Sequence, residues 1–398
     1  MAEVLAGPSE YAATNPPAKL TMMVRGGLQH SWGRKEEWMV RAINEIRVIG
    51  LGRVGELVAT LLLDAGFDVD GYDVRQRHDV GFAAKALDVN DAAALRGVLA
   101  GADAVVSCLP FHLNMPVAEA AHEVGVHYFD LTEDVPTTQR VRQLAAEDRA
   151  IAYASQCGLA PGLIGIIGAS LTKHFEDLRS IELKVGALPR HPTGLLGYAF
   201  NWSSEGVVNE YLNDCEVLRS GRRQMVPAMA DPERVMIGGI ELEAALTSGG
   251  LGTMCETFSG QVQRLDYKTM RYPGHFQLIR FFFDELGLRD RRELAGEILV
   301  DAKPPVDDDV VYLHASVEGR MDGLLYRKQY VRAYHPLQVN GRMWRAISWT
   351  TAASAAAVVE LVADGRLPQR GFVKQEEISF DELLSTTNGA RFANLGRV

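Results

Sequence analysis

Three glycines at positions 50, 52 and 55 stand between a short apolar run and an apolar helical pattern. This Gly-x-Gly-x-x-Gly spacing is typical of a turn that holds the pyrophosphate of a dinucleotide. Gly50 lets the chain turn sharply, Gly52 lets the pyrophosphate approach the backbone, and Gly55 lets the helix pack closely on the strand. The backbone N–H groups that open the helix, at Arg53 and Val54, would face the phosphates. We interpret this stretch as a dinucleotide-binding site.

Asp73 ends the next apolar run, at a position where an acidic side chain accepts hydrogen bonds from both ribose hydroxyls. Its carboxylate would repel a 2′-phosphate and so favours NAD. Arg75 and Arg77 follow at once and could neutralise such a phosphate, so NADP is the alternative. A strand-to-helix turn without any ligand is the other interpretation, and the placement of Asp73 argues against it. We predict that the cofactor is NAD.

Two loops at the carboxyl ends of later strands carry the next chemical candidates, because ligands of open α/β sheets lie beyond those ends. The loop LPFHLN begins with Leu109 and Pro110 and would lie under the nicotinamide ribose, while DLTED at 130–134 would lie beside the nicotinamide. Glu133 and Asp134 could instead cap a helix ahead of Pro136. The titratable candidates are His112, Asp130 and Glu133.

Three polar clusters in the second half are unusually rich in glycine and aromatic residues for ordinary strands. They are FNWSSEGVVNEY at 200–211, ALTSGGLGTM at 245–254 and LDYKTMRYPGH at 265–275. The last contains Tyr267, Lys268, Thr269, Arg271, Tyr272 and His275. Pro273 and Gly274 fix a loop there, and Arg271 offers a planar fork suited to a carboxylate. A solvated strand edge is the alternative interpretation of that run.

Short apolar runs alternate with helical patterns from Ile46 to about residue 160, which predicts a parallel sheet with right-handed crossovers. The expected strands are 46–49, 67–72, 83–88, 104–108, 127–131 and 151–155. The expected helices after the one that follows the glycine turn are 90–99, 115–123 and 137–149. Another apolar helix should begin near Pro161, because proline suits a first helical turn.

From about residue 178 the pattern changes to alternating strands with a few helices, which favours antiparallel pairing. Strands are expected at 180–185, from 310, at 325–333 and at 343–349, with helices at 275–288 and 349–365. The fold class is α/β, with a Rossmann-type parallel sheet domain and an α+β substrate domain that has a mixed, largely antiparallel sheet. The predicted parts are a disordered or loosely docked extension at 1–44, a dinucleotide domain at 45–160, a substrate and oligomerisation domain at 161–345, and a helix and tail at 346–398 that return to the first domain.

The composition narrows the class of protein. The chain has 398 residues, of which 47% are hydrophobic and 23% charged, as in soluble globular proteins. A net charge of −10 argues against a nucleic-acid partner. No apolar run approaches the roughly 20 residues of a membrane span, and no signal peptide is recognisable. The four cysteines lack metal-ligand spacing, so we expect no metal site. Together with the missing span and signal peptide, they lead us to expect a cytoplasmic protein.

Six segments, taken in their order along the chain, resemble those of the saccharopine dehydrogenase family. They are the glycine turn, HYFDL, GLAPGLIGIIGASL, SSEG, TSGG and YKTMRYPGH. The resemblance extends from Ile46 to about Gly371. GLAPG is shared broadly in that family, whereas TSGG and YKTMRYPGH are most similar to the L-lysine 6-dehydrogenase branch. The N-terminal extension departs from the family, whose chains usually begin at the first strand.

The resemblance implies a nicotinamide-dependent enzyme that oxidises a carbon bearing nitrogen and forms homodimers or homotetramers. For the lysine branch it implies that the ε-carbon gives up hydride, and that the products are ammonia and a cyclising 2-aminoadipate 6-semialdehyde. Hydride can leave only beside an uncharged amine. Lysine's amine has a pKa near 10.4, so neutralising it at pH 7.5 costs about 4 kcal/mol. The site therefore needs a desolvated slot with a base, or an alkaline optimum.

On this hypothesis Arg271 holds the substrate α-carboxylate and Glu205 the α-amine, with Tyr267 and Thr269 nearby. Asp130 or His275 accepts the proton, and Lys268 is a further alternative. A second hypothesis is a reductase that joins an amine to a keto or aldehyde acid, whose extra carboxylate would need another arginine. The candidates for that arginine are Arg222, Arg223 and Arg320. A third is a non-catalytic nucleotide-binding scaffold.

Overall fold

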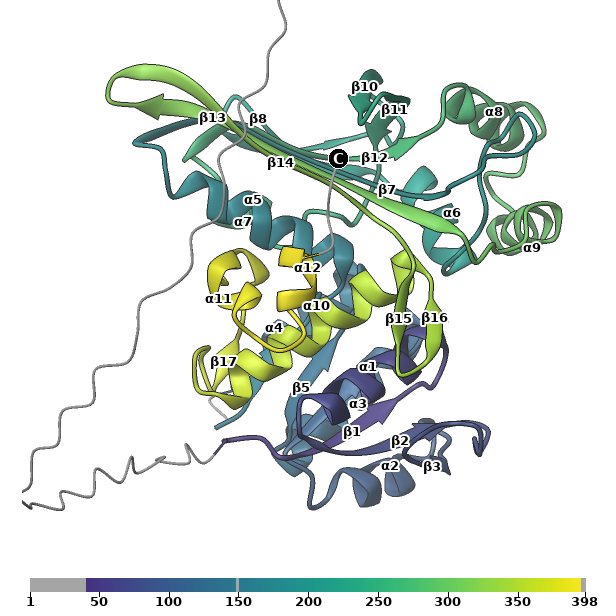
Figure 1. Cartoon of the computed structure of the whole chain (residues 1–398), viewed down its shortest axis with the longest axis vertical. Coiled ribbons are helices and arrows are strands. Elements are labelled where there is room, and N and C mark those ends of the chain that lie inside the picture. The colour runs from purple at the N-terminus through teal and green to yellow at the C-terminus, as the bar shows by residue number, and fades with distance from the viewer. Residues whose placement is uncertain (1–40, 148–149, 395–398) are drawn as a thin grey trace, which may run out of the picture. The chain divides into compact units, whose positions relative to one another are not determined.

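Seven parallel strands form the first sheet of the computed structural model, which describes residues 41–147 and 150–394 (Figure 1). Their order across the sheet is β17-β6-β5-β4-β1-β2-β3. The bounds are β1 Glu45–Ile49, β2 Asp68–Asp73, β3 Ala83–Ala86, β4 Ala104–Ser107, β5 His127–Asp130, β6 Ala152–Ala154 and β17 Gly371–Phe372. The predicted parallel sheet is confirmed. Most of the predicted extension, residues 1–40, lies outside the described residues.

Helices pack on both faces of this sheet because its central strands are apolar on both sides. Val105 and Val106 are neighbours on β4, both are fully buried, and they belong to separate apolar clusters on opposite faces. The helices between the strands are α1 Arg53–Asp64, α2 Ala92–Leu99, α3 Asn114–Val124 and α4 Val135–Ala145. The last two residues of the predicted helix 137–149 lie in the gap of the description.

A second sheet is mixed and largely antiparallel, as predicted, with the order β10-β11-β12-β7-β13-β14 and with β8 pairing to β12 and β9. Within it β7 and β12 are parallel. The bounds are β7 Asp177–Pro189, β8 Cys215–Arg219, β9 Arg222–Val226, β10 Glu233–Ile237, β11 Ile240–Leu246, β12 Val262–Arg271, β13 Asp309–Met321 and β14 Leu324–Tyr334. The hairpin β15 Leu337–Val339 and β16 Arg342–Trp344 follows.

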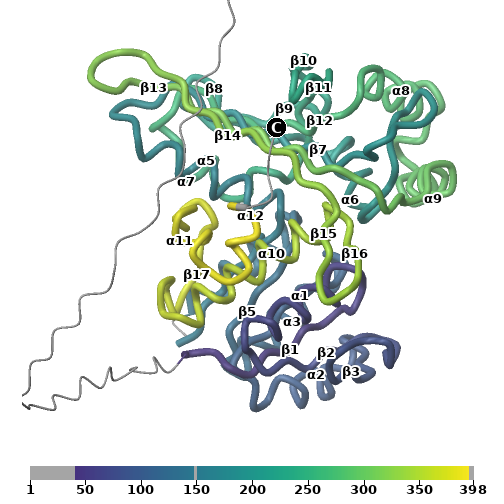
Figure 2. Tube along the Cα trace, viewed as in Figure 1, coloured from purple at the N-terminus to yellow at the C-terminus, as the bar shows by residue number. Residues whose placement is uncertain are grey.

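The second half of the chain also contributes helices, some of which lie between the two sheets (Figure 1). They are α5 Ile164–Thr172, α6 Ser204–Leu212, α7 Met254–Thr257, α8 His275–Arg280, α9 Arg292–Ala302, α10 Ala346–Ala363, α11 Phe380–Leu384 and α12 Ala390–Asn394. Figure 2 traces α5 and α10 through the space between the two sheets, where both helices join one apolar cluster with α1 and with strands of each sheet. The two sheets therefore share a core.

Among the predicted element boundaries that differ from the structure, two concern Pro161 and the strand 343–349. Pro161 does not open a helix: it is extended, with φ −70° and ψ 159°, and α5 begins at Ile164. The chain first turns through Gly162, whose φ of +125° is a conformation that favours glycine. The predicted strand 343–349 ends at Trp344, because α10 already begins at Ala346.

The early start of α10 has a cause distant in sequence. Asp309 at the start of β13 accepts hydrogen bonds from the backbone N–H groups of Ala346 at 2.6 Å and Ile347 at 3.0 Å. These groups have no partner inside the helix, so Asp309 serves as its N-terminal cap. The cap lies 37 residues from Ala346 in the chain, which explains why local sequence does not reveal it.

Helix α10 meets the length and composition of a membrane span, but 89% of it is buried within the protein. It packs against α1, and in the tail beyond it β17 joins the first sheet while α11 packs against α5 and α10 (Figure 1). β17 pairs in parallel with β6, and the Asn388 side-chain amide donates to the carbonyl of Leu61 in α1 at 3.2 Å. The C-terminal segment thus completes the first sheet.

Replacing Asp309 by alanine should lower the free energy of unfolding by about 2 kcal/mol, because two buried N–H groups lose their acceptor. Chemical denaturation measures the change. Asp308→Ala is the matched control, since this neighbouring acid is exposed and its loss should change stability by less than about 0.5 kcal/mol. Equal effects of the two substitutions would contradict the capping role.

Candidate active site

A cavity of about 510 Å³ lies between the carboxyl ends of β1, β4 and β5 and one face of β7 and β12. The start of α10 and the segment before α6 close its sides. The residues that line it include Gly52, Arg53, Val54, Gly55, Leu109, Pro110, Glu133, Glu210, Tyr267, Thr269, Arg271 and Arg345. The glycine turn and the YKTMR segment therefore face one space.

The glycine turn has the shape of a phosphate cradle. Gly50 has a φ of +92°, and a side chain there would meet the Cys108 carbonyl at 2.9 Å. A Cβ on Gly55 would lie 1.8 Å from the Gly50 oxygen, so the close helix packing requires glycine. Gly52 faces open space, and no side chain caps the helix that begins at Arg53. The free N–H groups of this helix end fit a pyrophosphate.

Asp73 and Arg75 lie outside the cavity lining. The Asp73 carboxylate accepts the backbone N–H of Leu51 at 2.7 Å, which places it directly beside the glycine turn. The Arg75 side chain is exposed. Arg77 is already engaged: it donates to the Leu51 carbonyl at 2.9 Å and pairs with Glu56 at 3.2 Å. An acid and an exposed arginine are therefore neighbours beside the glycine turn.

Successive residues of the YKTMR segment face opposite sides of β12. Tyr267, Thr269 and Arg271 are buried and all line the cavity. Lys268 points to the opposite face, where its ammonium donates to the Asp231 carbonyl at 2.6 Å and pairs with Glu233 at 2.8 Å. Successive strand residues face opposite sides, so Lys268 cannot share a site with Arg271. This placement does not support the predicted role of Lys268 as proton acceptor.

Arg271 presents a guanidinium that is only 1% exposed. Its Nε donates to the Tyr211 hydroxyl at 2.8 Å, and its Nη1 donates to the Met270 carbonyl at 3.0 Å. Its Nη2 lies 3.4 Å from Glu210, and the Tyr198 ring stacks 4.6 Å from the guanidinium carbon. Three of its five N–H groups are thus used, which leaves two for a ligand carboxylate.

His275 supports Arg271 and does not enter the cavity. Its Nδ1 donates to the Leu196 carbonyl at 2.9 Å, so its Nε2 accepts the Tyr211 hydroxyl, also at 2.9 Å. Tyr211 in turn accepts from Arg271. Burial, with the nearby Arg271 charge, lowers the pKa of His275 to about 3. This imidazole is neutral and its lone pair is occupied, so it does not fit the predicted role of proton acceptor.

Asp130, a predicted proton acceptor, is held by hydrogen bonds from two loops. It is fully buried and accepts the backbone N–H groups of Thr132 and Gln156, each at 3.0 Å. The Ser155 hydroxyl donates to both of its oxygens. Burial raises the pKa of this carboxyl, and these hydrogen bonds oppose the shift. Asp130 therefore joins the loops after β5 and β6 and does not line the cavity.

Glu210 takes the place predicted for Glu205. Glu205 is exposed and lines a separate surface groove together with His112. Glu210, about one and a half turns later on α6, is buried, lines the cavity and lies beside Arg271. Burial raises the pKa of Glu210 to about 8, and the Arg271 charge opposes the shift. The helical period could have identified it, since Gly206, Val207 and Glu210 share the buried face.

Glu133 also lines the cavity, whereas its neighbour Asp134 caps α4 by accepting the Thr137 N–H at 2.9 Å. The two acids that could both have been helix caps thus have different roles. Burial raises the pKa of Glu133. The charge of Glu133 also contributes to the raised pKa of Glu210. The cavity can therefore bind a carboxylate and an amine, and it can take up a proton from that amine.

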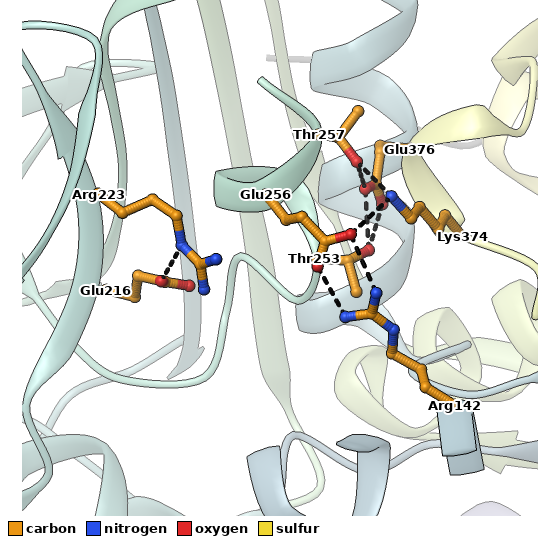
Figure 3. Close-up of polar contacts among 8 residues, drawn as sticks. All are labelled: Arg142, Glu216, Arg223, Thr253, Glu256, Thr257, Lys374 and Glu376. Atoms are coloured by element: carbon orange, nitrogen blue, oxygen red, sulfur yellow. Dashed lines mark hydrogen bonds and ion pairs between the residues drawn. The ribbon is translucent and has the colours of Figure 1, made fainter. Parts of the chain in front are cut away.

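A polar cluster connects the two halves of this site (Figure 3). Glu256 of α7 pairs with Arg142 of α4 at 2.7 Å and with Lys374 of the C-terminal tail at 3.3 Å. Thr253 donates to Glu376 of that tail at 2.8 Å. The cluster fixes α7, and with it the preceding TSGG loop, against the first domain.

Among the described residues, no group of three or more His, Cys, Asp or Glu could hold a metal ion.

Two family models match successive parts of the chain. The saccharopine dehydrogenase NADP binding domain matches residues 46–158, and the saccharopine dehydrogenase C-terminal domain matches residues 158–387. A saccharopine dehydrogenase (NADP(+), L-glutamate-forming) of Pyricularia oryzae is 30% identical over 37% of this chain and 33% of its own length. A mitochondrial alpha-aminoadipic semialdehyde synthase of Rattus norvegicus is 28% identical over 32% of this chain and 14% of its own length.

The matched stretch thus spans about a third or less of these curated relatives. The apo saccharopine dehydrogenase (L-Glu forming) of Saccharomyces cerevisiae superposes with a TM-score of 0.70. The superposition covers 89% of this chain and 99% of the yeast chain, at 15% sequence identity. At that identity the similarity shows a shared fold.

Substituting Gly52 by alanine should weaken binding of a reduced nicotinamide dinucleotide at least tenfold, because the new methyl group occupies the approach of the pyrophosphate. Quenching of protein fluorescence on titration with NADH measures the affinity. Gly97→Ala on α2 is the matched control, since a Cβ there also meets nothing within 4 Å. Unchanged affinity in Gly52→Ala would exclude the turn as the phosphate site.

Proposed function

Because the chain belongs to the saccharopine dehydrogenase family, we propose that it is a nicotinamide-dependent oxidoreductase acting on a carbon that bears an amine. The observation that carries this proposal is the cavity that places Arg271, Glu210 and Glu133 opposite the glycine turn. The proposed reaction is the oxidative deamination of the ε-amine of L-lysine. The protonated amine, oxidised nicotinamide and water give the aldehyde, ammonium, reduced nicotinamide and a proton.

The residues divide the work between the two ends of the substrate. Arg271 has two free N–H groups for the α-carboxylate, and Glu210 beside it suits the α-ammonium. Glu133 follows β5, at the edge of the sheet where a nicotinamide lies in such folds. Its buried carboxyl, with a raised pKa, is placed to accept the proton of the reacting amine. The bound nicotinamide supplies the hydride acceptor.

We propose NAD as the cofactor, because the Asp73 carboxylate lies beside the turn while Arg75 is exposed. The fluorescence titration, repeated with NADPH, tests this choice: tighter NADPH binding would show that Arg75 outweighs Asp73.

A second candidate function is that of a saccharopine-type dehydrogenase. Such an enzyme joins an amino acid to a keto acid by reduction, or cleaves the joined product by oxidation. The names of the matched relatives support it, and Arg53 and Arg345 also line the cavity and could hold further carboxylates. Arg345 is engaged with Asp307 at 2.8 Å, and Arg53 stands at the start of α1, where phosphates would bind. The predicted alternatives Arg222, Arg223 and Arg320 do not line the cavity. These placements favour the substrate with one carboxylate.

Incubation of the protein with L-lysine and NAD, without a keto acid, should produce reduced cofactor that absorbs at its characteristic wavelength. In Arg271→Lys the KM for lysine should rise by about 10- to 100-fold, because a charge-assisted contact worth roughly 1.5 to 3 kcal/mol is lost. Turnover of saccharopine but not of lysine would favour the second candidate. A thermal unfolding profile equal to that of the wild type shows that the substitution leaves the fold intact.

The pH dependence of lysine oxidation should reveal the ionisation of the Glu210 carboxyl. Its carboxyl has a pKa of about 8 and must be ionised to hold an ammonium group. The titration of the substrate amine already lowers kcat/KM for lysine about tenfold per unit, and below pH 8 the protonation of Glu210 should add a further fall of about tenfold per unit. Glu210→Gln should remove this inflection and leave only the titration of the substrate amine. An inflection that persists in Glu210→Gln would assign it to another group.

A further inference from the structure

A second chamber of about 170 Å³ adjoins the main cavity and shares Glu133, Glu210 and Tyr267 with it. Of the described residues, those of the glycine turn do not line this chamber. At its other end it is lined by Asp214, which is exposed, and by Met225, which is 61% exposed. The chamber therefore leads from the wall of the active site to the protein surface on a side away from the cofactor turn.

The roof of the chamber is the TSGG loop identified in the sequence. Gly249 has a φ of +89°, and a Cβ there would meet Glu133 at 3.1 Å. A Cβ on Gly250 would overlap the Tyr267 ring at 2.3 Å. Glycine at both positions thus lets the loop backbone lie directly on the two residues that separate the chambers. The polar cluster around α7 keeps this loop in place (Figure 3).

Gln156 marks a polar binding position inside the chamber. It lines the chamber and is only 4% exposed, and its side-chain amide has no hydrogen-bond partner within the described ranges. Its backbone has a φ of +66° and is held by Asp130 at 3.0 Å. Its Oε1 would lie 2.6 Å from a Cβ on Gly252. Because this amide faces the chamber and its oxygen and N–H groups have no protein partner there among the described residues, it can bond a small polar ligand.

The charges of the chamber indicate a cation. Glu133 at the inner end and Asp214 at the mouth have no ion-pair partner in the part of the chain that the structure describes. Glu216 is different, because Arg223 pairs with it at 2.5 Å (Figure 3). Carboxylate and amide oxygens together accept N–H hydrogen bonds, and the volume limits the ligand to a small group. Ammonium and short primary alkylammonium ions meet these requirements.

We propose that this chamber binds ammonium and is the route by which ammonium leaves the active site and water enters it. The inference rests on the proposed oxidative deamination. Water adds to the C=N carbon, its oxygen becomes the aldehyde oxygen as the C–N bond breaks, and the released ammonia takes a proton to become ammonium. Glu133 forms part of both chambers, so the nitrogen passes from one to the other at its carboxylate. The aldehyde meanwhile stays held by Arg271.

Thermal unfolding provides a direct binding measurement with ammonium chloride and methylammonium chloride as probes, at constant ionic strength. Both should raise the Tm relative to sodium chloride, and tetramethylammonium chloride, which has no N–H group, should not. Gln156→Asn should abolish the rise; asparagine tolerates the positive φ but is too short to reach the ligand. Asp214→Asn should weaken it. Glu293→Gln is the matched control, an exposed acid in the separate groove beside α9.

Product inhibition provides the second measurement. The inhibition constant of ammonium against lysine oxidation should rise at least tenfold in Gln156→Asn, as for a lost hydrogen bond to a charged group, and stay unchanged in Glu293→Gln. A Tm rise that survives in Gln156→Asn would place ammonium in the main cavity and overturn the proposal. So would lysine turnover with no ammonium-specific Tm rise. An ammonium-specific rise in a protein that does not oxidise lysine would contradict the proposed function and leave the cation site standing.

Discussion

The organisation of the second domain depends on one buried charge. A guanidinium removed from water is costly unless its donors are paired, and Arg271 is nearly inaccessible. Its partners come from separate parts of the chain: Tyr211 and Glu210 from α6, His275 from the start of α8, and Tyr198 from the loop after β7. These elements surround the end of β12 because each contributes a group that the charge requires. The arginine is thereby held rigidly, with two N–H groups left toward the cavity.

The cavity also depends on contacts that join the two halves of the molecule. Helix α10 contributes Ile347, Ser348 and Thr351 to its wall and packs on α1, which begins at the glycine turn. On the other side, the Arg142–Glu256–Lys374 cluster ties α4, α7 and the tail together. These ion pairs are only partly buried, so each contributes modestly to stability. Their effect is geometric, because they fix the distance between the acids after β5 and the residues of β12.

The sequence predicts the fold better than the site. Periodic apolar runs and the glycine spacing are local signals, and they indicate both sheets, the cofactor turn and Arg271. The period of two along β12 would also have excluded Lys268 from the face of Arg271. Other features of the site and the fold depend on residues that are distant in the sequence. The hydrogen bond of His275 to Tyr211, the burial of Asp130 between two loops and the cap that Asp309 gives α10 each depend on tertiary contacts. Glu205 and Glu210 differ in sequence by one turn and a half, and only burial decides between them.

The position of β17 bears on how the protein is made. This strand occupies one edge of the first sheet, yet it follows the whole second domain in the chain, and Asn388 then attaches to α1. During synthesis the first domain emerges early, but one edge of β6 remains unpaired until residue 371 has left the ribosome. The nucleotide-binding half therefore matures last, although its strands are translated first. An exposed strand edge can pair with other chains, so the nascent protein is open to aggregation through β6 during this interval.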